Sequence, residues 1–157
     1  MTPTESRNMP QTTVLVVEDD SGLAEMYRLG LELEGYRVVT ASSGEAALQT
    51  LSHLQPDIIC LDISLPGIDG FRVLEHLRSS GIHQQTPVLL LTNHSEPELR
   101  ERGRQLGARG YLIKAETTPN ALCQIIMSRA QPCPGAARTL AEPMAEVGNV
   151  QDNAAVG

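Results

Sequence analysis

Three uninterrupted runs of apolar residues place the strongest limit on how this chain can fold. They cover residues 14–17, 58–61 and 88–91, and each is four residues long. Runs of this length and composition are typical of strands buried on both faces, as the central strands of a parallel sheet are. A membrane-crossing helix needs roughly 20 consecutive apolar residues, so none of these runs can span a bilayer.

Strand-like and helix-like segments alternate five times along the chain. The predicted strands cover residues 13–17, 37–40, 57–61, 87–91 and 110–113. Between them apolar residues recur at helical spacing, as Leu23, Tyr27 and Leu31 do in the first helical segment. This (βα)5 alternation predicts an α/β fold in which helices cover both faces of a doubly wound, five-stranded parallel sheet. The alternation alone leaves the strand order open.

Three of the helical segments open with polar residues that commonly cap helices. Ser42 with Glu45, and Ser95 with Glu98, match the capping box, in which two side chains satisfy free backbone N–H groups. Thr118 stands before a proline, a residue that favours the first turn of a helix. We therefore predict that these serines and this threonine mark helix starts.

The domain organisation follows from where the alternation begins and ends. A chain of 157 residues is long enough for one domain, which we assign to residues 12–130. Residues 1–11 and 131–157 lie outside the pattern and contain few apolar residues at regular spacing, so we expect both segments to be disordered. The second segment is too short for a DNA-binding or catalytic domain, which predicts a single-domain protein.

Composition limits the partners and the compartment. The chain has 12 Lys and Arg residues against 19 Asp and Glu residues, and its net charge of −7 argues against the broad basic surface of a nucleic-acid-binding protein. No basic and apolar secretion signal opens the sequence, so we expect a cytoplasmic protein without membrane association. Three cysteines without metal-ligand spacing, Cys60, Cys123 and Cys133, predict free thiols.

Polar residues follow the predicted strands at their C-terminal ends. Glu18 and Asp19 follow the first strand, and Asp62 follows the third. Thr92 follows the fourth strand, and the fifth ends at Lys114, the only lysine in the chain. The C-terminal ends of parallel strands lie at one edge of the sheet, where ligands bind in open α/β folds. The sequence therefore predicts a single site that combines carboxylates, a hydroxyl and one ammonium group.

This set of residues points to phosphoryl chemistry with a hard cation. Carboxylates that meet at one point repel one another, and a cation relieves that repulsion. Oxygen ligands without His or Cys favour Mg²⁺. Asp62 is then a candidate nucleophile, because carboxylates form aspartyl-phosphate intermediates. Lys114 and the Thr92 hydroxyl are candidates for contacts with the phosphoryl oxygens.

Four motifs, in this order and spacing, match one known family. Residues 14–20 read Val-Leu-Val-Val-Glu-Asp-Asp, and residues 61–70 read Leu-Asp-Ile-Ser-Leu-Pro-Gly-Ile-Asp-Gly. Leu-Thr follows at 91–92 and Gly-Tyr-Leu-Ile-Lys at 110–114. The sequence from about residue 13 to 129 resembles the receiver domains of two-component response regulators, and among them the stand-alone chemotaxis regulators. The resemblance implies a flavodoxin-like sheet with strand order 2-1-3-4-5.

The resemblance also implies a role for each residue at the acidic end of the site. Asp62 would be the phosphoacceptor. Glu18 and Asp19 would hold Mg²⁺ together with Asp62, Asp19 as the direct ligand and Glu18 through water. The backbone carbonyl of Ser64 would complete the protein ligands of the metal.

On the opposite side, Lys114 would bind the phosphoryl group, and Thr92 and Tyr111 would form the pair that switches conformation after phosphorylation. The resemblance implies that the phosphoryl group comes from a sensor histidine kinase or a histidine phosphotransfer protein. A downstream protein target would then bind the switched form. Such a domain is no enzyme in the ordinary sense, although it catalyses its own phosphorylation and dephosphorylation.

Two positions depart from the family pattern. Asn93 stands after the switch hydroxyl, where a small residue is usual, and Ala115 stands after the lysine, where the family has a proline with a cis bond. A cis bond costs roughly 2.5–4 kcal/mol before a non-proline residue against about 0.5–1 kcal/mol before proline. Position 115 therefore either carries strain or has a trans bond. These departures are the only support for an alternative function, that of a degenerate receiver that binds proteins without phosphorylation.

Other functions fit the sequence less well. A phosphohydrolase with an aspartate nucleophile has a second Asp two positions later, where this chain has Ser64. A dinucleotide-binding domain needs a glycine-rich turn after the first strand, which this chain lacks. Four arginines near the fourth helix form either a solvated face, with favourable Glu96–Arg100 and Glu98–Arg102 pairs, or a partner-binding surface. They are Arg100, Arg102, Arg104 and Arg109.

Overall fold

The computed structural model describes residues 11–129, which form five strands, five α-helices and one short 3-10 turn. The strands are β1 (Thr13–Val17), β2 (Arg37–Ala41), β3 (Ile58–Asp62), β4 (Val88–Thr92) and β5 (Gly110–Ile113). The helices are α2 (Ser21–Leu33), α3 (Gly44–Leu51), α4 (Gly70–Ser79), α5 (Pro97–Gln105) and α6 (Pro119–Arg129), with the 3-10 turn η1 (Lys114–Glu116) before α6.

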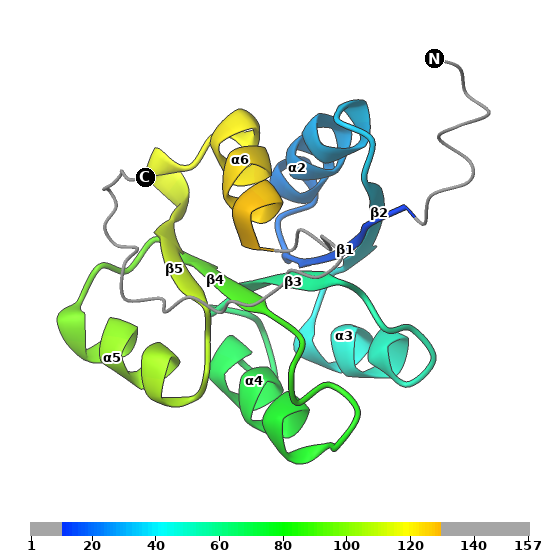
Figure 1. Ribbon diagram of the computed structural model, residues 1–157. Helices are drawn as coiled ribbons and strands as arrows, with labels where there is room; N and C mark the ends of the chain where they lie inside the picture. The colour runs from blue at the N-terminus through cyan, green and yellow to red at the C-terminus, as the bar shows by residue number, and fades with distance from the viewer. Residues whose placement is uncertain (1–10, 130–157) are drawn as a thin grey trace.

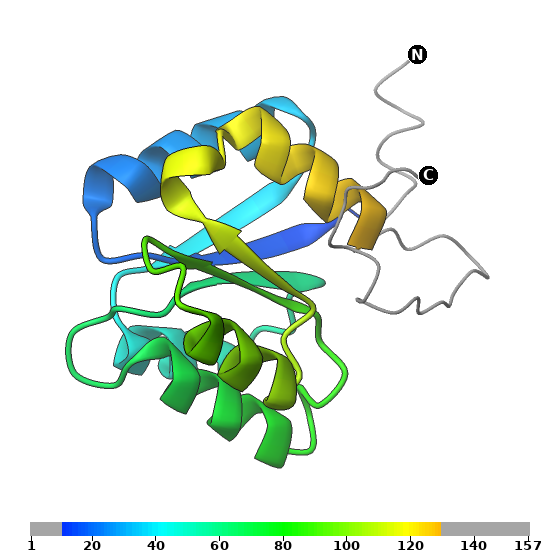
Figure 2. The same ribbon diagram turned by 90° about the vertical axis from the view of Figure 1, so that its left-hand side faces the viewer.

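The strands form one parallel sheet in the order β2-β1-β3-β4-β5. Helices α2 and α6 cover one face, and α3, α4 and α5 cover the other (Figures 1 and 2). This arrangement confirms the predicted doubly wound α/β fold and the strand order implied by the family resemblance. The central strands β1, β3 and β4 are buried along their whole length, as their unbroken apolar runs predicted.

The third strand begins one residue later than predicted, for a physical reason. Asp57 was assigned to this strand, but its backbone N–H donates to Thr13 O at 2.8 Å and its carboxylate accepts the N–H of Thr13 at 2.8 Å. The aspartate therefore anchors the start of β1 instead of extending β3. At its other end, β3 includes Asp62, which pairs in register with Leu91 of β4.

A hydrophobic cluster covers each face of the sheet. On the α2 and α6 side, Tyr27, Leu31, Leu122 and Ile126 are fully buried. The helical spacing of Leu23, Tyr27 and Leu31 predicted the buried face of α2. Cys60 and Cys123 belong to the same cluster as buried free thiols, in agreement with the expectation for them. On the other side the core includes Phe71, Leu74 and Leu77 of α4.

Two of the predicted helix starts are wrong. The cap of α3 is Ser43, whose Oγ accepts the N–H of Ala46 at 3.0 Å, and not Ser42. The helix α5 begins at Pro97 after Glu96, which makes no side-chain capping hydrogen bond. Proline at the first helical position has no N–H group to satisfy and a φ angle suited to a helix, so no capping box forms around Ser95.

The third predicted start is correct, since Thr118 Oγ1 accepts the N–H of Ala121 at 3.0 Å at the beginning of α6. Gln11, assigned to the disordered N-terminal segment, donates a hydrogen bond to Gly35 O at 3.0 Å. The remaining residues predicted to be disordered, 1–10 and 131–157, lie outside the described part of the chain, as does Cys133.

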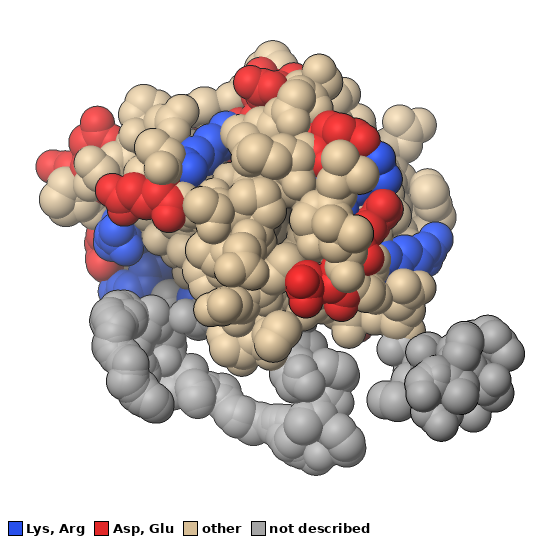
Figure 3. Space-filling model, turned by 90° about the horizontal axis from the view of Figure 1, so that it is seen from above, with Lys and Arg blue, Asp and Glu red and all other residues tan. Residues whose placement is uncertain are grey.

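Within residues 11–129, no helix has the length and apolar character needed to cross a membrane. The face formed by α2 and α6 carries acidic and basic side chains next to one another, as Arg28 lies beside Glu25 and Glu32 on α2, and neither sign forms one continuous area (Figure 3).

Candidate functional site

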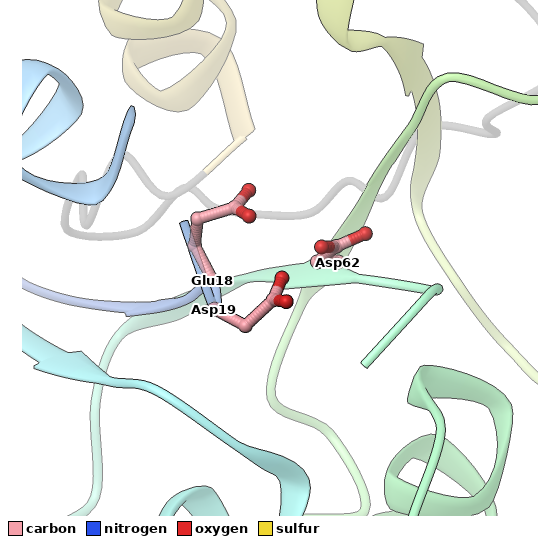
Figure 4. Close-up of side chains that lie close together, drawn as sticks. All are labelled: Glu18, Asp19 and Asp62. Carbon is pink, nitrogen blue, oxygen red and sulfur yellow. The ribbon is translucent and has the colours of Figure 1, made fainter. Parts of the chain in front are cut away.

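Three carboxylates meet at the C-terminal edge of the sheet. Glu18 and Asp19 directly follow β1, and Asp62 is the last residue of β3, the strand that pairs with β1. One oxygen of each side chain lies within 4.8 Å of the others. Figure 4 shows the three side chains projecting from the two strand ends into the same region. The pairing of β1 with β3 therefore brings together the acids that the sequence placed at separate strand ends.

The backbone after β1 turns Glu18 inward. Its N–H donates to Ala41 O at the end of β2 at 2.9 Å, and its Oε2 accepts the N–H of Asp20 at 3.1 Å. Glu18 is only 1% exposed, whereas Asp19 next to it is exposed. Asp20 caps α2 by accepting the N–H of Leu23 at 3.0 Å. One carboxylate is therefore buried and one faces solvent at the same strand end.

Asp62 is also buried, with 1% of its surface exposed. Its Oδ1 accepts the N–H of Ser64 at 3.0 Å, which fixes the orientation of the carboxylate. The chain then returns toward β3, where the N–H of Gly70 donates to Ile63 O at 2.9 Å. A Cβ atom at Gly70 would lie 2.4 Å from the carbonyl oxygen of Asp62, so this return requires glycine. The local backbone thus presents Asp62 at a fixed position.

Lys114 supplies the positive charge. Its Nζ lies 2.8 Å from Glu18 Oε1 and donates a hydrogen bond to Asp62 Oδ2 at 3.0 Å. Only 12% of its side chain is exposed. Lys114 directly follows β5 and opens η1, and none of the described peptide bonds is cis, so the bond to Ala115 is trans. The departure from the family's proline is therefore accommodated by a trans bond.

Burial and neighbouring charges have opposing effects on the pKa values of Glu18 and Lys114. Burial raises the pKa of Glu18, and the neighbouring Asp62 adds to the rise, while Lys114 and the N–H of Asp20 partly counter it. Burial alone would lower the pKa of Lys114, but its close contacts with the carboxylates of Glu18 and Asp62 more than offset this, so its pKa is raised. Lys114 is therefore held firmly in its charged form.

The donor set fits a hard divalent cation. Lys114 Nζ lies close to Glu18 Oε1, but the two atoms are not aligned for a hydrogen bond. This buried carboxylate oxygen therefore has no hydrogen-bond donor among the described residues. Asp19 and Asp62 each place a carboxylate oxygen within 4.8 Å of Glu18. One ammonium group cannot balance three carboxylates, and oxygen-only ligands favour Mg²⁺ over softer metals. The residues present thus match the chemistry of a magnesium site.

Thr92 and Tyr111 are linked through His94. Thr92 is the last residue of β4 and fully buried, and its Oγ1 accepts the N–H of His94 at 3.0 Å. The hydroxyl of Tyr111 donates to the carbonyl oxygen of His94 at 3.0 Å, and the ring is partly buried. The predicted switch pair therefore shares one backbone residue, a link that the sequence did not indicate.

Comparison with known proteins shows the family to which the chain belongs. The sequence model of the response regulator receiver domain matches residues 14–127, most of the chain. The chain belongs to the response-regulator receiver family. Receivers are generally phosphoacceptors and not enzymes, and the family binds Mg²⁺ at an acidic pocket of the kind formed by Glu18, Asp19 and Asp62.

The matched part of the chain covers about half the length of its curated relatives, which are regulatory proteins. The chain is 39% identical over 102 residues to the transcriptional regulatory protein AfsQ1 of Streptomyces coelicolor, covering 65% of this chain and 44% of AfsQ1. It is 35% identical over 121 residues to the phosphate regulon transcriptional regulatory protein PhoB of Escherichia coli, covering 76% and 53%. The receiver thus spans about half the length of these relatives.

Solved structures of receivers match over nearly their whole length. The chemotaxis response regulator CheY4 of Vibrio cholerae gives a TM-score of 0.71 at 30% identity, covering 76% of this chain and 98% of CheY4. The receiver domain of NarL from Mycobacterium tuberculosis gives 0.72 at 31% identity, covering 79% and 99%. These similarities support the fold and the family of the described residues.

The arginines of the receiver's α5 do not make the predicted pairs with glutamates four residues earlier. Arg100 lies over the ring of Tyr111 at 4.9 Å from its centroid. Arg102 lies over the ring of Phe71 at 4.3 Å, with Glu75 at 3.9 Å. The rings and an acid from a neighbouring helix are available at these distances, and cation–π contacts with exposed arginines are favourable by about 0.5–1 kcal/mol.

A hydrogen bond near the site joins two residues for which the sequence indicated no role there: Tyr27, expected only on an apolar helix face, and Thr117. The hydroxyl of Tyr27 donates to the carbonyl oxygen of Thr117 at 3.1 Å, across 90 residues of chain. Thr117 lies in the loop that follows Lys114. The one signal in the sequence was a tyrosine on an otherwise apolar helix face, because a buried tyrosine usually finds a partner for its hydroxyl.

Proposed function

We propose that this receiver accepts a phosphoryl group on Asp62 and works as a phosphorylation switch. The observation that carries the proposal is the buried Asp62 carboxylate, which contacts Lys114 at 3.0 Å and lies within 4.8 Å of carboxylate oxygens of Glu18 and Asp19. A buried nucleophile between an ammonium group and a cation-binding acid pair suits the transfer of a highly charged group.

In the proposed transfer, a carboxylate oxygen of Asp62 attacks the phosphorus of a phosphohistidine. The new O–P bond forms as the N–P bond breaks, and the leaving imidazole nitrogen takes up a proton from solvent. Lys114 stays close to the transferred oxygens as a point charge, and the Thr92 hydroxyl donates a hydrogen bond to one of them. Hydrolysis reverses the phosphorylation: water attacks phosphorus, the O–P bond to Asp62 breaks, and inorganic phosphate leaves while the Asp62 carboxylate is restored and the proton of the attacking water passes to solvent. The domain would catalyse both steps with its own residues.

Glu18, Asp19 and Asp62 would hold Mg²⁺, and the family resemblance adds the backbone carbonyl of Ser64. When bound, the ion neutralises negative charge on the phosphoryl group. Ser64 already directs its N–H to Asp62 Oδ1, so its backbone lies beside the acceptor. Coordination by its carbonyl stays a prediction.

The switch would run through His94. The N–H of His94 donates a hydrogen bond to Thr92 Oγ1, and the carbonyl oxygen of His94 accepts one from the hydroxyl of Tyr111. If the Thr92 hydroxyl turns to donate to a phosphoryl oxygen, the N–H of His94 loses its acceptor, and the adjoining loop is free to move. Tyr111 is then released toward the interior. The movement of this loop and of Tyr111 would change the surface around them and so alter the affinity of the receiver for a downstream protein.

The proposed phosphoryl donor is a sensor histidine kinase or a histidine phosphotransfer protein, the partner that membership of the receiver family implies. Absence of nucleic-acid binding stays a prediction based on net charge. The curated relatives are named transcriptional regulatory proteins, and the chain matches about half of each.

The proposal is tested with beryllofluoride, a compact mimic of the phosphoryl group. We expect ¹⁹F NMR to detect bound beryllofluoride only when Mg²⁺ is present, and binding to be lost in Asp62→Asn. Asp69→Asn is the matched control, because Asp69 lies on the same return segment but caps α4. Absence of a complex with the wild type, or an equal complex with Asp62→Asn, would contradict the proposal.

A separate experiment tests whether the acidic cluster binds Mg²⁺. Calorimetry with Mg²⁺ should give binding to the wild type that weakens at least about tenfold in Asp19→Asn, since one ligand charge is lost, and stays unchanged in Asp69→Asn. Equal affinity in all three proteins would remove the magnesium assignment.

A further inference from the structure

We propose that Tyr27 is a positioning residue that holds the backbone of Lys114 in place through Thr117. The inference deepens the proposed function, because it concerns how the phosphoryl-binding ammonium group reaches the acidic cluster. It rests on a chain of hydrogen bonds between the helix that follows the acids and the loop that follows the lysine.

The backbone at Lys114 lies at the edge of the sheet, one residue beyond the last pairing of β5, that of Ile113 with Thr92. β5 is the last strand in the sheet order and pairs with β4 alone. All four residues of β5 are partly exposed, in contrast to the fully buried strands β1, β3 and β4. Lys114 comes directly after this edge strand, yet its ammonium group must reach two carboxylates that are almost fully buried. Beyond the pairing of Ile113 with Thr92, the backbone of Lys114 is held by contacts outside the sheet.

Thr117 supplies those contacts. Its N–H donates to Lys114 O at 3.1 Å, and its Oγ1 donates to Ile113 O at 2.8 Å. Only 7% of Thr117 is exposed. These two hydrogen bonds close a tight loop on both sides of the bond between Ile113 and Lys114. The position of Thr117 therefore sets the position of the lysine backbone.

Tyr27 in turn fixes Thr117. Its hydroxyl donates to Thr117 O at 3.1 Å, and the whole residue is buried on α2 among the apolar side chains of that face. A tyrosine has few rotatable bonds, so a packed ring holds its hydroxyl at a defined point. Helix α2 begins at Ser21, two residues after Asp19. The segment that carries the carboxylates thus also holds the loop that carries the ammonium group.

The residue after the lysine makes this link more important in this chain. Ala115 follows Lys114 through a trans bond, whereas the family pattern implies a proline, whose ring fixes φ. Alanine leaves the φ angle of the loop free. Loss of the Tyr27 hydroxyl would therefore leave the loop, and with it the lysine, less constrained.

The test compares Tyr27→Phe, which keeps the ring, with Tyr36→Phe, a partly buried tyrosine just before β2. Lys114 is the only lysine in the chain, so selective ¹³C labelling of lysine gives one side-chain signal. We expect this signal to shift and broaden in folded Tyr27→Phe and to be unchanged in Tyr36→Phe. An unchanged lysine signal in Tyr27→Phe would refute the inference, and this readout needs no phosphorylation.

A double-mutant cycle distinguishes positioning from a general loss of stability. With acetyl phosphate as donor, Tyr27→Phe should lower the phosphorylation rate constant about fivefold, the change expected when one neutral hydrogen bond is lost. In a Lys114→Ala background the same change should have less than a twofold effect, because the group to be positioned is gone. Equal losses in both backgrounds would overturn the inference.

The outcomes separate this inference from the proposed function. A wild type that gains no phosphoryl group contradicts the function, and the lysine signal still decides the role of Tyr27. A phosphorylated wild type with an unchanged Tyr27→Phe rate contradicts the positioning role alone. If Tyr27→Phe does not fold, Thr117→Val replaces it, because this change removes the hydrogen bond from Thr117 to Ile113 in the same loop. It should give the same shift of the lysine signal and the same coupling to Lys114. An unchanged lysine signal and no coupling would refute the inference.

Discussion

Replacement of Lys114 by methionine isolates the electrostatics of the site. Methionine keeps an unbranched apolar stem, so the change mainly removes the ammonium group that contacts Glu18 and Asp62. Both carboxylates are almost completely buried, with side-chain exposures of 1% and 2%. Removal of one partner from a buried ion pair typically costs 3–5 kcal/mol, because it leaves an uncompensated buried charge. Since 12% of the lysine side chain is exposed, water can partly reach the vacated position. We therefore expect a loss of about 3 kcal/mol at neutral pH without metal.

The assay is urea unfolding followed by circular dichroism, in EDTA and in excess Mg²⁺. A ligand that binds only the folded state adds a stabilisation of RT ln(1 + [L]/Kd). Without the competing ammonium group, Mg²⁺ should bind Lys114→Met more tightly than the wild type and restore more stability to it. Lys114→Arg, which keeps the charge, should lose much less in EDTA. A loss below about 1 kcal/mol for Lys114→Met in EDTA, or equal stabilisation of both proteins by Mg²⁺, would refute this electrostatic account.

Three further predictions follow from contacts outside the ion pair. Gly70→Ala places a Cβ 2.4 Å from a backbone carbonyl oxygen and should destabilise the fold by about 2 kcal/mol or more in urea unfolding. Gly22→Ala meets only an ordinary contact at 3.4 Å on α2 and should not destabilise it; similar losses for both would contradict the steric argument. Ser43→Ala removes the cap of α3 and should lower the free energy of unfolding by about 1 kcal/mol, while Ser42→Ala should leave it almost unchanged. A larger loss in Ser42→Ala than in Ser43→Ala would show that Ser42 is the cap, as the capping box predicted. Burial raises the pKa of Cys60 to about 12, so at pH 8 only about one thiol in ten thousand is ionised. In a variant whose other two cysteines are replaced by serine, Cys60 should react with a thiol reagent only after the protein unfolds. Rapid reaction of the folded protein would contradict the burial of this thiol.

The sequence predicted the fold because its signals were local and repeated. Each central strand contains an unbroken apolar run, and a polar residue directly follows each of these runs. Asp62 and Lys114 could therefore be assigned to one site from the position of strand ends alone. Parallel pairing then brings these ends together without further information.

Errors arose where several polar residues compete for one role. Ser42 and Ser43 are both good caps, and only the backbone angles of Ser43, which is extended at φ −154° and ψ 167°, decide between them. At α5 the proline at its first position made a capping box unnecessary. Short-range patterns could not settle either case.

Contacts between distant segments lay beyond sequence reasoning. Tyr27 and Thr117 are 90 residues apart and meet through a single hydrogen bond. His94 connects Thr92 to Tyr111 through its backbone, which no side-chain pattern can indicate. Such contacts depend on the packing of helices and loops around the sheet.

The most direct test of the central claim is the mass of the intact protein after incubation with acetyl phosphate. The account predicts that the wild type gains the mass of one phosphoryl group when Mg²⁺ is present and none in EDTA. Asp62→Asn should gain nothing, whereas Asp69→Asn should behave as the wild type does. A wild type that stays unmodified at short times with Mg²⁺, or a gain of the same size in Asp62→Asn, would contradict the assignment of Asp62 as the phosphoacceptor.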